Sequence, residues 1–304
     1  MANEKEELGY EIVDEEDVAY SDSGCDCDGG CEGCSGSCES CGGSCGGEQD
    51  FGVAAHPMSH VKRVIGIVSG KGGVGKSLIT SLSAVMLNRK GFKVGVMDAD
   101  MTGPSIPMGF GVHSRATANA DGILPTMTEK GIGIMSVNLF LDEETEPVIW
   151  RGAVVANTVK QFWTDVVWGD VDYMFVDMPP GTGDVPLTIF QSLPVDGIIV
   201  VASPQELVGM IVTKAVRMAQ MMNVPILGLV ENMSWFRCDK CGEKHYIYGE
   251  SRLQEAADKY GLEILGRLPI RQDIAAAVDA GKIEDVDFPE MAEIADKVAA
   301  KLPV

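Results

Sequence analysis

Short apolar runs alternate with longer helical patterns over most of the chain. Five of these runs are almost continuously apolar, as strands are when helices cover both faces of their sheet. They are VIGIVS (64–69), KVGVMDA (93–99), YMFVDM (173–178), GIIVVAS (197–203) and ILGLVENM (226–233). A helical pattern at 77–91 follows the first run and stops at Gly91. The alternation predicts an α/β fold with a mostly parallel, doubly wound sheet covered by helices.

Two segments depart from this alternation. The segment RCDKCGEKHYIYG, 237–249, interrupts the chain between the fifth strand and a helical pattern at 250–260, after which a strand at 261–269 and two helices are expected. The first 58 residues are acidic, rich in Gly and Cys, and poor in apolar residues. Such a segment buries too little surface to offset its ordering entropy. We therefore expect a disordered tail, 1–58, and an α/β domain, 59–304, with an insertion at 237–249.

The charge is concentrated in that tail. Of the formal net charge of −21, the first 50 residues carry −14, from 15 acidic residues and one lysine. The remainder is mildly acidic, which argues against binding to nucleic acid or to a membrane surface. No apolar run approaches the roughly 18–20 residues of a membrane span. The acidic start has no signal-peptide pattern, so we expect a cytoplasmic protein with reduced thiols.

The stretch VSGKGGVGKS, 68–77, has the spacing of a phosphate-binding loop between a strand and a helix. Glycines in such a loop let backbone N–H groups converge on phosphate oxygens, and the helix N-terminus adds positive potential. Lys76 is expected to reach the β- and γ-phosphates, and the Ser77 hydroxyl to ligate Mg²⁺. The expected nucleotide-binding residues of the loop are Gly70, Lys71, Gly72, Gly73, Val74, Gly75, Lys76 and Ser77.

Carboxylates stand at the ends of two other predicted strands. Asp177 ends YMFVDM and is followed by PPGTGD, 179–184, which we interpret as a nucleotide-sensing loop; Asp177 is a candidate for holding Mg²⁺. In VMDADMTGPS, Asp98 and Asp100 lie at the end of another predicted strand, and strand alternation points both to the same side. One of them could orient an attacking water. All three could instead cap or turn the chain toward the next helix.

The motifs GKGGVGKS, DADMTGPS and VDMPPGTGD together resemble those of the P-loop NTPases with a deviant Walker A motif. Within that class, DADMTGPSIP, VENMSWF and the CxxC that follows resemble the Mrp/ApbC iron–sulfur cluster carriers, over about residues 60–300. The resemblance implies that Lys71 reaches across a homodimer to the partner's nucleotide, and that Asp100, beside Asp98, positions water. It also implies an adenine contact for Asn232, for which a strand-end hydrogen bond is the alternative.

Cys238 and Cys241 form a C-x₂-C pair within the insertion. Two thiolates leave a four-ligand site half complete, and the body of the chain has no second such pair. An isologous dimer would supply one, and the resemblance implies a [4Fe–4S] cluster bridging two subunits. Structural Zn²⁺ in the same Cys₄ site is the alternative. His245 has the spacing of a third ligand, although a histidine here is more often a surface or turn residue.

Seven further cysteines lie in the tail, between residues 25 and 45, and include the pairs Cys31/Cys34 and Cys38/Cys41. Their odd number and the reducing compartment disfavour a disulfide framework. Relatives of the carriers hold a cluster on four tail cysteines, but the spacing here departs from theirs. These four are therefore possible ligands, and a metal-scavenging or redox-buffering tail is the alternative.

The function expected from the resemblance is an ATP-hydrolysing, Mg²⁺-dependent homodimer that carries a [4Fe–4S] cluster to apo-proteins. A positioning ATPase with a structural zinc site is one alternative, although the C-terminal stretch DFPEMAEIADKVAAKLPV lacks the basic, Trp-rich face of a membrane helix. A nucleotide-gated iron–sulfur reductase is the other.

Overall fold

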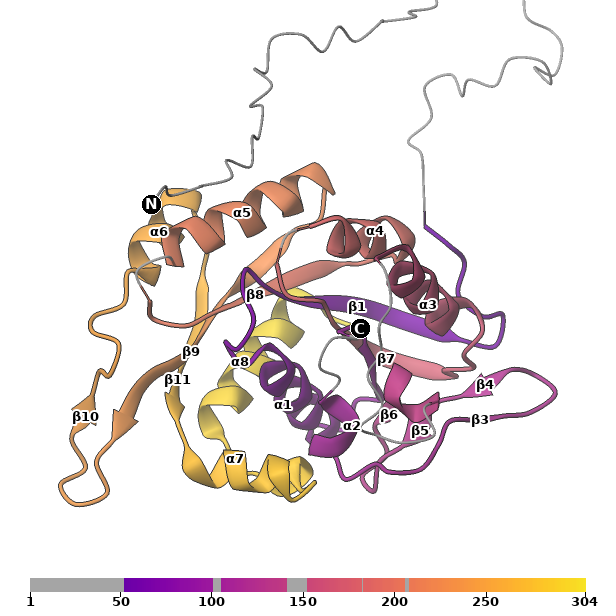
Figure 1. Ribbon diagram of the computed structural model, residues 1–304, viewed down its shortest axis with the longest axis horizontal. Helices are drawn as coiled ribbons and strands as arrows, with labels where there is room; N and C mark the ends of the chain where they lie inside the picture. Colours follow the sequence, from indigo (N-terminus) through magenta and orange to yellow (C-terminus); the bar gives the residue numbers. More distant parts are fainter. Residues whose placement is uncertain (1–51, 101–104, 141–151, 182, 206–207) are drawn as a thin grey trace, which may run out of the picture. The chain divides into compact units, whose positions relative to one another are not determined.

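The predicted apolar runs form one central sheet (Figure 1). The computed structural model describes residues 52–100, 105–140, 152–181, 183–205 and 208–304. Its long strands are β1 (His60–Ser69), β2 (Val94–Asp98), β7 (Asp170–Asp177), β8 (Gly197–Ala202), β9 (Ile226–Arg237) and β11 (Ile264–Ile270). They pair in parallel, in the order β11-β9-β8-β1-β7-β2. The α/β class and the parallel sheet are confirmed.

Five short strands were not predicted. β5 (Thr126–Met127) pairs with β6 (Gly133–Met135), β3 (Thr117–Ala118) with β4 (Ile123–Leu124), and β10 (Lys244–His245) with the end of β9, all antiparallel. Each has only two or three residues, too few to show an alternation of polar and apolar positions. β9 is also longer than predicted and runs into the expected insertion, so that 237–249 begins as the turn of a β-hairpin.

Helices cover both faces of the sheet (Figure 1). One face carries α1 (Lys76–Arg89), α2 (Ile106–Gly109), α7 (Gln272–Asp279) and α8 (Pro289–Lys301); the other carries α3 (Gly152–Thr164), α4 (Asp184–Ser192), α5 (Val208–Met221) and α6 (Leu253–Tyr260). Two 3₁₀ turns, η1 (Val137–Phe140) and η2 (Ile283–Asp285), complete the described elements.

Strand alternation explains the two cores. Along β1, Ile65 and Ile67 pack toward α1 and α8, while Val64 and Val68 pack toward α3, α4 and α5. Every one of these four side chains is at most 2% exposed. Burying a side chain of this size contributes about 1.5–3 kcal/mol, so the apolar runs stabilise both layers at once.

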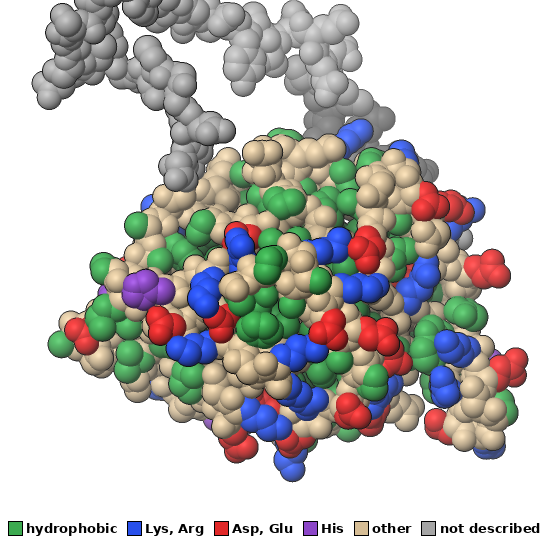
Figure 2. All heavy atoms as spheres, turned by 180° about the vertical axis from the view of Figure 1, so that it is seen from behind, with side chains coloured by type: hydrophobic (Ala, Val, Ile, Leu, Met, Phe, Trp, Pro, Cys, Tyr) green, Lys and Arg blue, Asp and Glu red, His purple; other side chains and the backbone are tan. Residues whose placement is uncertain are grey.

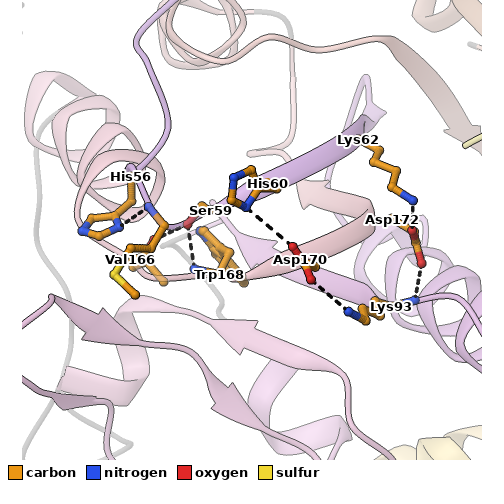
Figure 3. A network of polar contacts seen from close by, with 10 residues as sticks. His56, Ser59, His60, Lys62, Lys93, Val166, Trp168, Asp170 and Asp172 are labelled. Atoms are coloured by element: carbon orange, nitrogen blue, oxygen red, sulfur yellow. Dashed lines mark hydrogen bonds and ion pairs between the residues drawn. The ribbon is translucent and has the colours of Figure 1, made fainter.

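Polar contacts join the amino-terminal ends of β1 and β7, opposite the edge where the candidate site lies (Figure 3). The Ser59 hydroxyl donates to Val166 O at 3.1 Å and accepts from Trp168 N at 2.8 Å. Lys62 Nζ donates to Asp172 Oδ1 at 2.7 Å, and Lys93 N donates to Asp172 Oδ2 at 2.8 Å. The two bonds to Asp172, that from Lys62 first, lower the pKa of its carboxyl.

Contacts divide the chain into two units, Met1–Gln49 and Asp50–Val304, and all described residues belong to the second. The predicted tail up to residue 51, with all its cysteines, lies outside the described residues, and the boundary at residue 58 stays a prediction. No helix among the described residues is long and apolar enough to cross a membrane. Figure 2 shows acidic and basic side chains interspersed over one face of the molecule.

Candidate functional site

The phosphate-binding loop connects β1 to α1 at the carboxyl edge of the sheet, where ligands bind in open parallel sheets. Gly73 and Gly75 have φ values of +77° and +82°, in the left-handed region that favours glycine. A Cβ atom built on Gly75 would lie 2.2 Å from Asn232 Nδ2. Glycine is therefore favoured at both positions by the left-handed backbone, and at Gly75 also because a Cβ atom has no space.

Lys76, the first residue of α1, has a buried ammonium group between two carboxylates. Its Nζ atom lies 2.8 Å from Asp177 Oδ2 and 3.3 Å from Asp100 Oδ2. Although these distances define ion pairs, Nζ makes no hydrogen bond of good geometry with any described residue. A buried cation that is held by ion pairs but not by well-directed hydrogen bonds fits an anionic ligand such as phosphate.

Asp177, at the end of β7, also binds the first turn of α1. Ser77 Oγ donates to Asp177 Oδ2 at 2.5 Å, and Thr80 Oγ1 donates to Asp177 Oδ1 at 2.7 Å. A hydroxyl and a carboxylate side by side are the oxygen donors that Mg²⁺ prefers. The residues present therefore fit the magnesium ion that such a nucleotide site uses.

Asp98 ends β2 and Asp100 follows two residues later, and the surroundings of the two carboxylates differ. Asp98 is 1% exposed, and it accepts from Asp100 N at 3.1 Å and from Ser136 Oγ at 3.1 Å. Burial raises the pKa of Asp98 well above its usual value, and the neighbouring Asp177 raises it further. Asp100 instead lies beside Lys76, with Oδ2 at 3.3 Å from the Lys76 Nζ atom.

Two predicted residues, Lys71 of the loop and Asn232 of β9, make contacts that join the loop to other parts of the sheet. The Lys71 ammonium group donates to the side chain of Gln205, which follows β8 in the same chain. Asn232 Nδ2, on β9, donates to Val74 O at 3.0 Å and is almost fully buried. This bond supports the loop backbone, and it is the strand-end hydrogen bond that was the alternative to an adenine contact. The adenine contact and the role of Lys71 across a dimer stay predictions.

The second candidate site is the β9–β10 hairpin, at one end of the sheet (Figure 1). Cys238 N donates to Glu243 O at 2.9 Å, and Gly242 N donates to Cys238 O at 2.8 Å. The ligand atoms of Cys238, Cys241 and His245 all lie within 4.8 Å of one another. Hydrogen bonds from the backbone of Cys241 and then Lys240 lower the pKa of the Cys238 thiol. The thiolate that binds metals is thereby favoured.

Thr80 and Ser136 are polar contacts of the site that the sequence analysis missed. Thr80 lies one helical turn after Lys76 and three residues after Ser77, so the helical period could have placed it beside Asp177. Ser136 follows a three-residue strand, and no local pattern marks it as a partner of Asp98. The tail cysteines Cys31, Cys34, Cys38 and Cys41 lie outside the described residues.

The glycine-rich loop, its buried lysine and the strand-end carboxylates define the nucleotide site of a P-loop NTPase. A family model described as a NUBPL iron-transfer P-loop NTPase, of the ParA type, matches residues 60–302. The chain belongs to this family of iron–sulfur cluster carriers and transfer proteins.

Named relatives agree with that assignment. The iron-sulfur cluster carrier protein of Methanocaldococcus jannaschii is 47% identical over 74% of this chain and 78% of its own length. The iron-sulfur cluster transfer protein NUBPL of Mus musculus is 39% identical over 74% of this chain and 71% of its own. The resemblance to the carriers found in the sequence is confirmed.

Solved structures support the same fold. A nucleotide-binding protein from Archaeoglobus fulgidus, in complex with ADP and with cobalt, is 39% identical. It matches 76% of this chain and 90% of its own, with a TM-score of 0.69. The MinD cell division protein of Aquifex aeolicus matches 78% of this chain and 97% of its own, with a TM-score of 0.52. Its identity of 20% shows the fold alone.

Proposed function

We propose that the protein is an ATP-hydrolysing carrier that works as a homodimer and passes a [4Fe–4S] cluster to apo-proteins. The observation that carries the proposal is the Cys238–Cys241 pair, half-exposed and exposed at the turn of the β9–β10 hairpin, in a chain that also has a complete phosphate-binding loop. Two such pairs around a dimer axis would supply the four thiolates of a cluster. Thiolates at the surface of a hairpin would let that cargo leave.

The nucleotide would be held by Gly70–Ser77, with Ser77 and Asp177 as the residues that hold Mg²⁺. When bound, Mg²⁺ neutralises charge that develops on phosphate oxygens. Lys76 would exchange its contacts with Asp100 and Asp177 for phosphate oxygens. Lys71, in the half-exposed part of the loop, would reach the nucleotide of the second subunit.

Asp98 and Asp100 would have different roles at the nucleotide site. Asp100 is the candidate for positioning water and accepting its proton, since its carboxylate lies beside Lys76, the residue expected to bind the phosphates. Asp98, whose pKa is raised by burial, would hold a proton and fix the Asp100 backbone through the bond from Asp100 N to Oδ1.

β9 offers a physical connection between nucleotide and cargo. Asn232 supports the phosphate loop from this strand, and Cys238 follows the strand's last residue. Six residues of strand span about 20 Å, so a shift of the loop backbone would act on the hairpin through one continuous element. We propose this strand as the route that couples hydrolysis to transfer.

The proposal places the protein in the cytoplasm, where thiols stay reduced, with apo iron–sulfur proteins as recipients and no nucleic acid or membrane as partner. A positioning ATPase with structural Zn²⁺ shares the fold, and a nucleotide-gated reductase could share the cluster as well. The Cys238–Cys241 pair lies exposed or half-exposed at a hairpin turn, which favours a cargo that is handed over.

Anaerobic reconstitution with iron and sulfide tests the cargo. The full chain is used with its seven tail cysteines changed to serine, so that only Cys238 and Cys241 remain. A cluster bridging two chains gives about two irons and two sulfides per chain, with the broad visible absorbance of thiolate-bound clusters. Cys238→Ser or Cys241→Ser should remove iron and sulfide together, because both chains of the dimer lose a ligand.

Glu243→Gln, on the same hairpin, is the matched control, since only the backbone carbonyl of Glu243 contacts Cys238. It should reconstitute like the parent protein. A parent protein that takes up Zn²⁺ but no iron and sulfide, while hydrolysing ATP normally, would replace the carrier by a zinc-stabilised switch.

A further inference from the structure

The β9–β10 hairpin brings together three metal donors from a single chain. The ligand atoms of Cys238, Cys241 and His245 lie within 4.8 Å of one another, and within the described ranges no other set of three His, Cys, Asp or Glu residues does so. A tetrahedral metal ion holds ligands at about 2.0–2.3 Å, which puts them roughly 3.3–3.8 Å apart. The three donors therefore need only small side-chain movements to bind one ion.

The backbone pairing of the hairpin explains why His245 lies beside the two cysteines. Lys244 pairs with Arg237 and His245 with Phe236, which returns the chain beside the residue that precedes Cys238. The turn between them is closed by the bond from Gly242 N to Cys238 O. Gly242 has φ +74°, the left-handed conformation that lets the chain reverse directly after Cys241. The donors are thus held by the fold of the turn.

His245 has no competing structural role in the part of the chain that the structure describes. Its ring is exposed, and no hydrogen bond or ion pair involves its side chain. Its one aromatic neighbour is Phe236, at 6.4 Å between ring centroids with the planes tilted by 36°. A neutral imidazole in this position can therefore turn toward a metal without breaking an existing contact.

We propose that Cys238, Cys241 and His245 of one chain bind a single thiophilic divalent ion, such as Zn²⁺, Co²⁺ or Fe²⁺, and leave its fourth coordination position open. Two thiolates and one imidazole are donors that these ions accept. Three protein ligands with one free position are also the arrangement of sites that exchange ligands, whereas structural sites are closed by four.

This inference rests on the proposed function in one respect, since both use Cys238 and Cys241 as ligands. It adds that one chain can retain a metal ion without a partner subunit. A shared Cys₄ site holds one ion for two chains, whereas the Cys₂His site holds one ion for each chain. The number of ions per chain therefore separates the two arrangements by a factor of two.

The test uses the full chain with its seven tail cysteines changed to serine, titrated anaerobically with Zn²⁺ or Co²⁺. The expected result is one ion per chain. X-ray absorption of the zinc form should show two sulfurs at about 2.3 Å and a nitrogen at about 2.0–2.1 Å, with the scattering pattern of an imidazole ring. Light-scattering mass measurement should find the loaded protein as single chains at low concentration.

His245→Ala should remove the imidazole signal while the two sulfurs stay. Affinity should fall by at least about 10-fold, since even the loss of a group that only orients a ligand costs 10- to 100-fold. His60→Ala is the matched control, because His60 is an exposed histidine at the start of β1, outside the hairpin. It should bind metal like the parent.

Four sulfurs, no imidazole and one ion per two chains would overturn the role of His245 and leave the carrier proposal standing. Metal binding that survives Cys238→Ser unchanged would overturn the hairpin as a metal site altogether. Iron and sulfide reconstitution, measured separately, then tells whether the carrier proposal fails with it.

Discussion

Gly75→Ala should destabilise the protein far more than the same change at a neighbouring glycine. Gly75 has φ +82°, and a left-handed conformation costs a residue with a Cβ atom about 1–2 kcal/mol. The new Cβ atom would also lie 2.2 Å from Asn232 Nδ2, a distance that real atoms do not reach. Asn232 must therefore move and lose its bond to Val74 O.

The size of that second effect follows from burial. Asn232 is 4% exposed, so its amide and the Val74 carbonyl are not rehydrated when their bond breaks. Leaving a buried polar group without a partner costs about 1–3 kcal/mol. Gly75→Ala should therefore lower the free energy of unfolding by about 2–5 kcal/mol, the sum of the backbone and the hydrogen-bond costs.

Gly73→Ala is the matched control. Gly73 has φ +77°, but a Cβ atom there would meet no atom within 4 Å. Only the backbone cost of about 1–2 kcal/mol applies. Urea denaturation at equilibrium gives both values, and adding Asn232→Ala to each variant isolates the clash. Asn232→Ala should recover part of the stability lost in Gly75→Ala and none of that lost in Gly73→Ala. Equal losses in the two glycine variants would refute the reasoning.

Two further predictions concern charged groups of the loop. Lys71→Ala should keep nucleotide binding and slow hydrolysis if Lys71 acts across a dimer; Gln205→Ala, which removes only its contact within the chain, should hydrolyse normally. Equal rates in wild type and Lys71→Ala would exclude the role. Burial raises the folded-state pKa of Asp98 above 3.8, so the folded protein favours the protonated carboxyl. The contribution of protonated Asp98 to the free energy of unfolding is therefore present at acid pH and is lost as the pH rises through the folded-state pKa. Asp98→Asn should therefore gain stability relative to wild type as the pH rises above 3.8 and through the folded-state pKa of Asp98, measured by urea denaturation at a series of pH values. A pH-independent difference would contradict the raised pKa.

The strands that carry the nucleotide site could be predicted because each is a continuous apolar run. The phosphate loop follows β1, while Asp98 and Asp177 end β2 and β7, and parallel strands bring their carboxyl ends to one edge. The motif spacing likewise placed Lys76 and Ser77 at the first turn of α1. Both kinds of signal are local in sequence.

What could not be predicted depends on contacts between distant residues. The sequence showed that Asn232 ends an apolar run, but not that it lies under Val74, 158 residues away along the chain. Asp98 and Asp100 have the same residue type and lie two positions apart, yet Asp98 is buried against Ser136 whereas Asp100 forms an ion pair with Lys76. His245 gained its place beside the cysteines from the pairing of a two-residue strand, which leaves no periodic pattern.

The measurement that tests the central claim most directly is transfer of a cluster to a defined apo-protein whose activity needs one. The reconstituted chain, with its tail cysteines changed to serine, is mixed with the recipient in the presence of a chelator that captures free iron. The account predicts that the recipient gains activity while the donor loses its visible absorbance in equal measure, and that Cys238→Ser donates nothing. Recipient activity that stays absent, or that Cys238→Ser restores equally well, would contradict the claim that this hairpin carries the cluster.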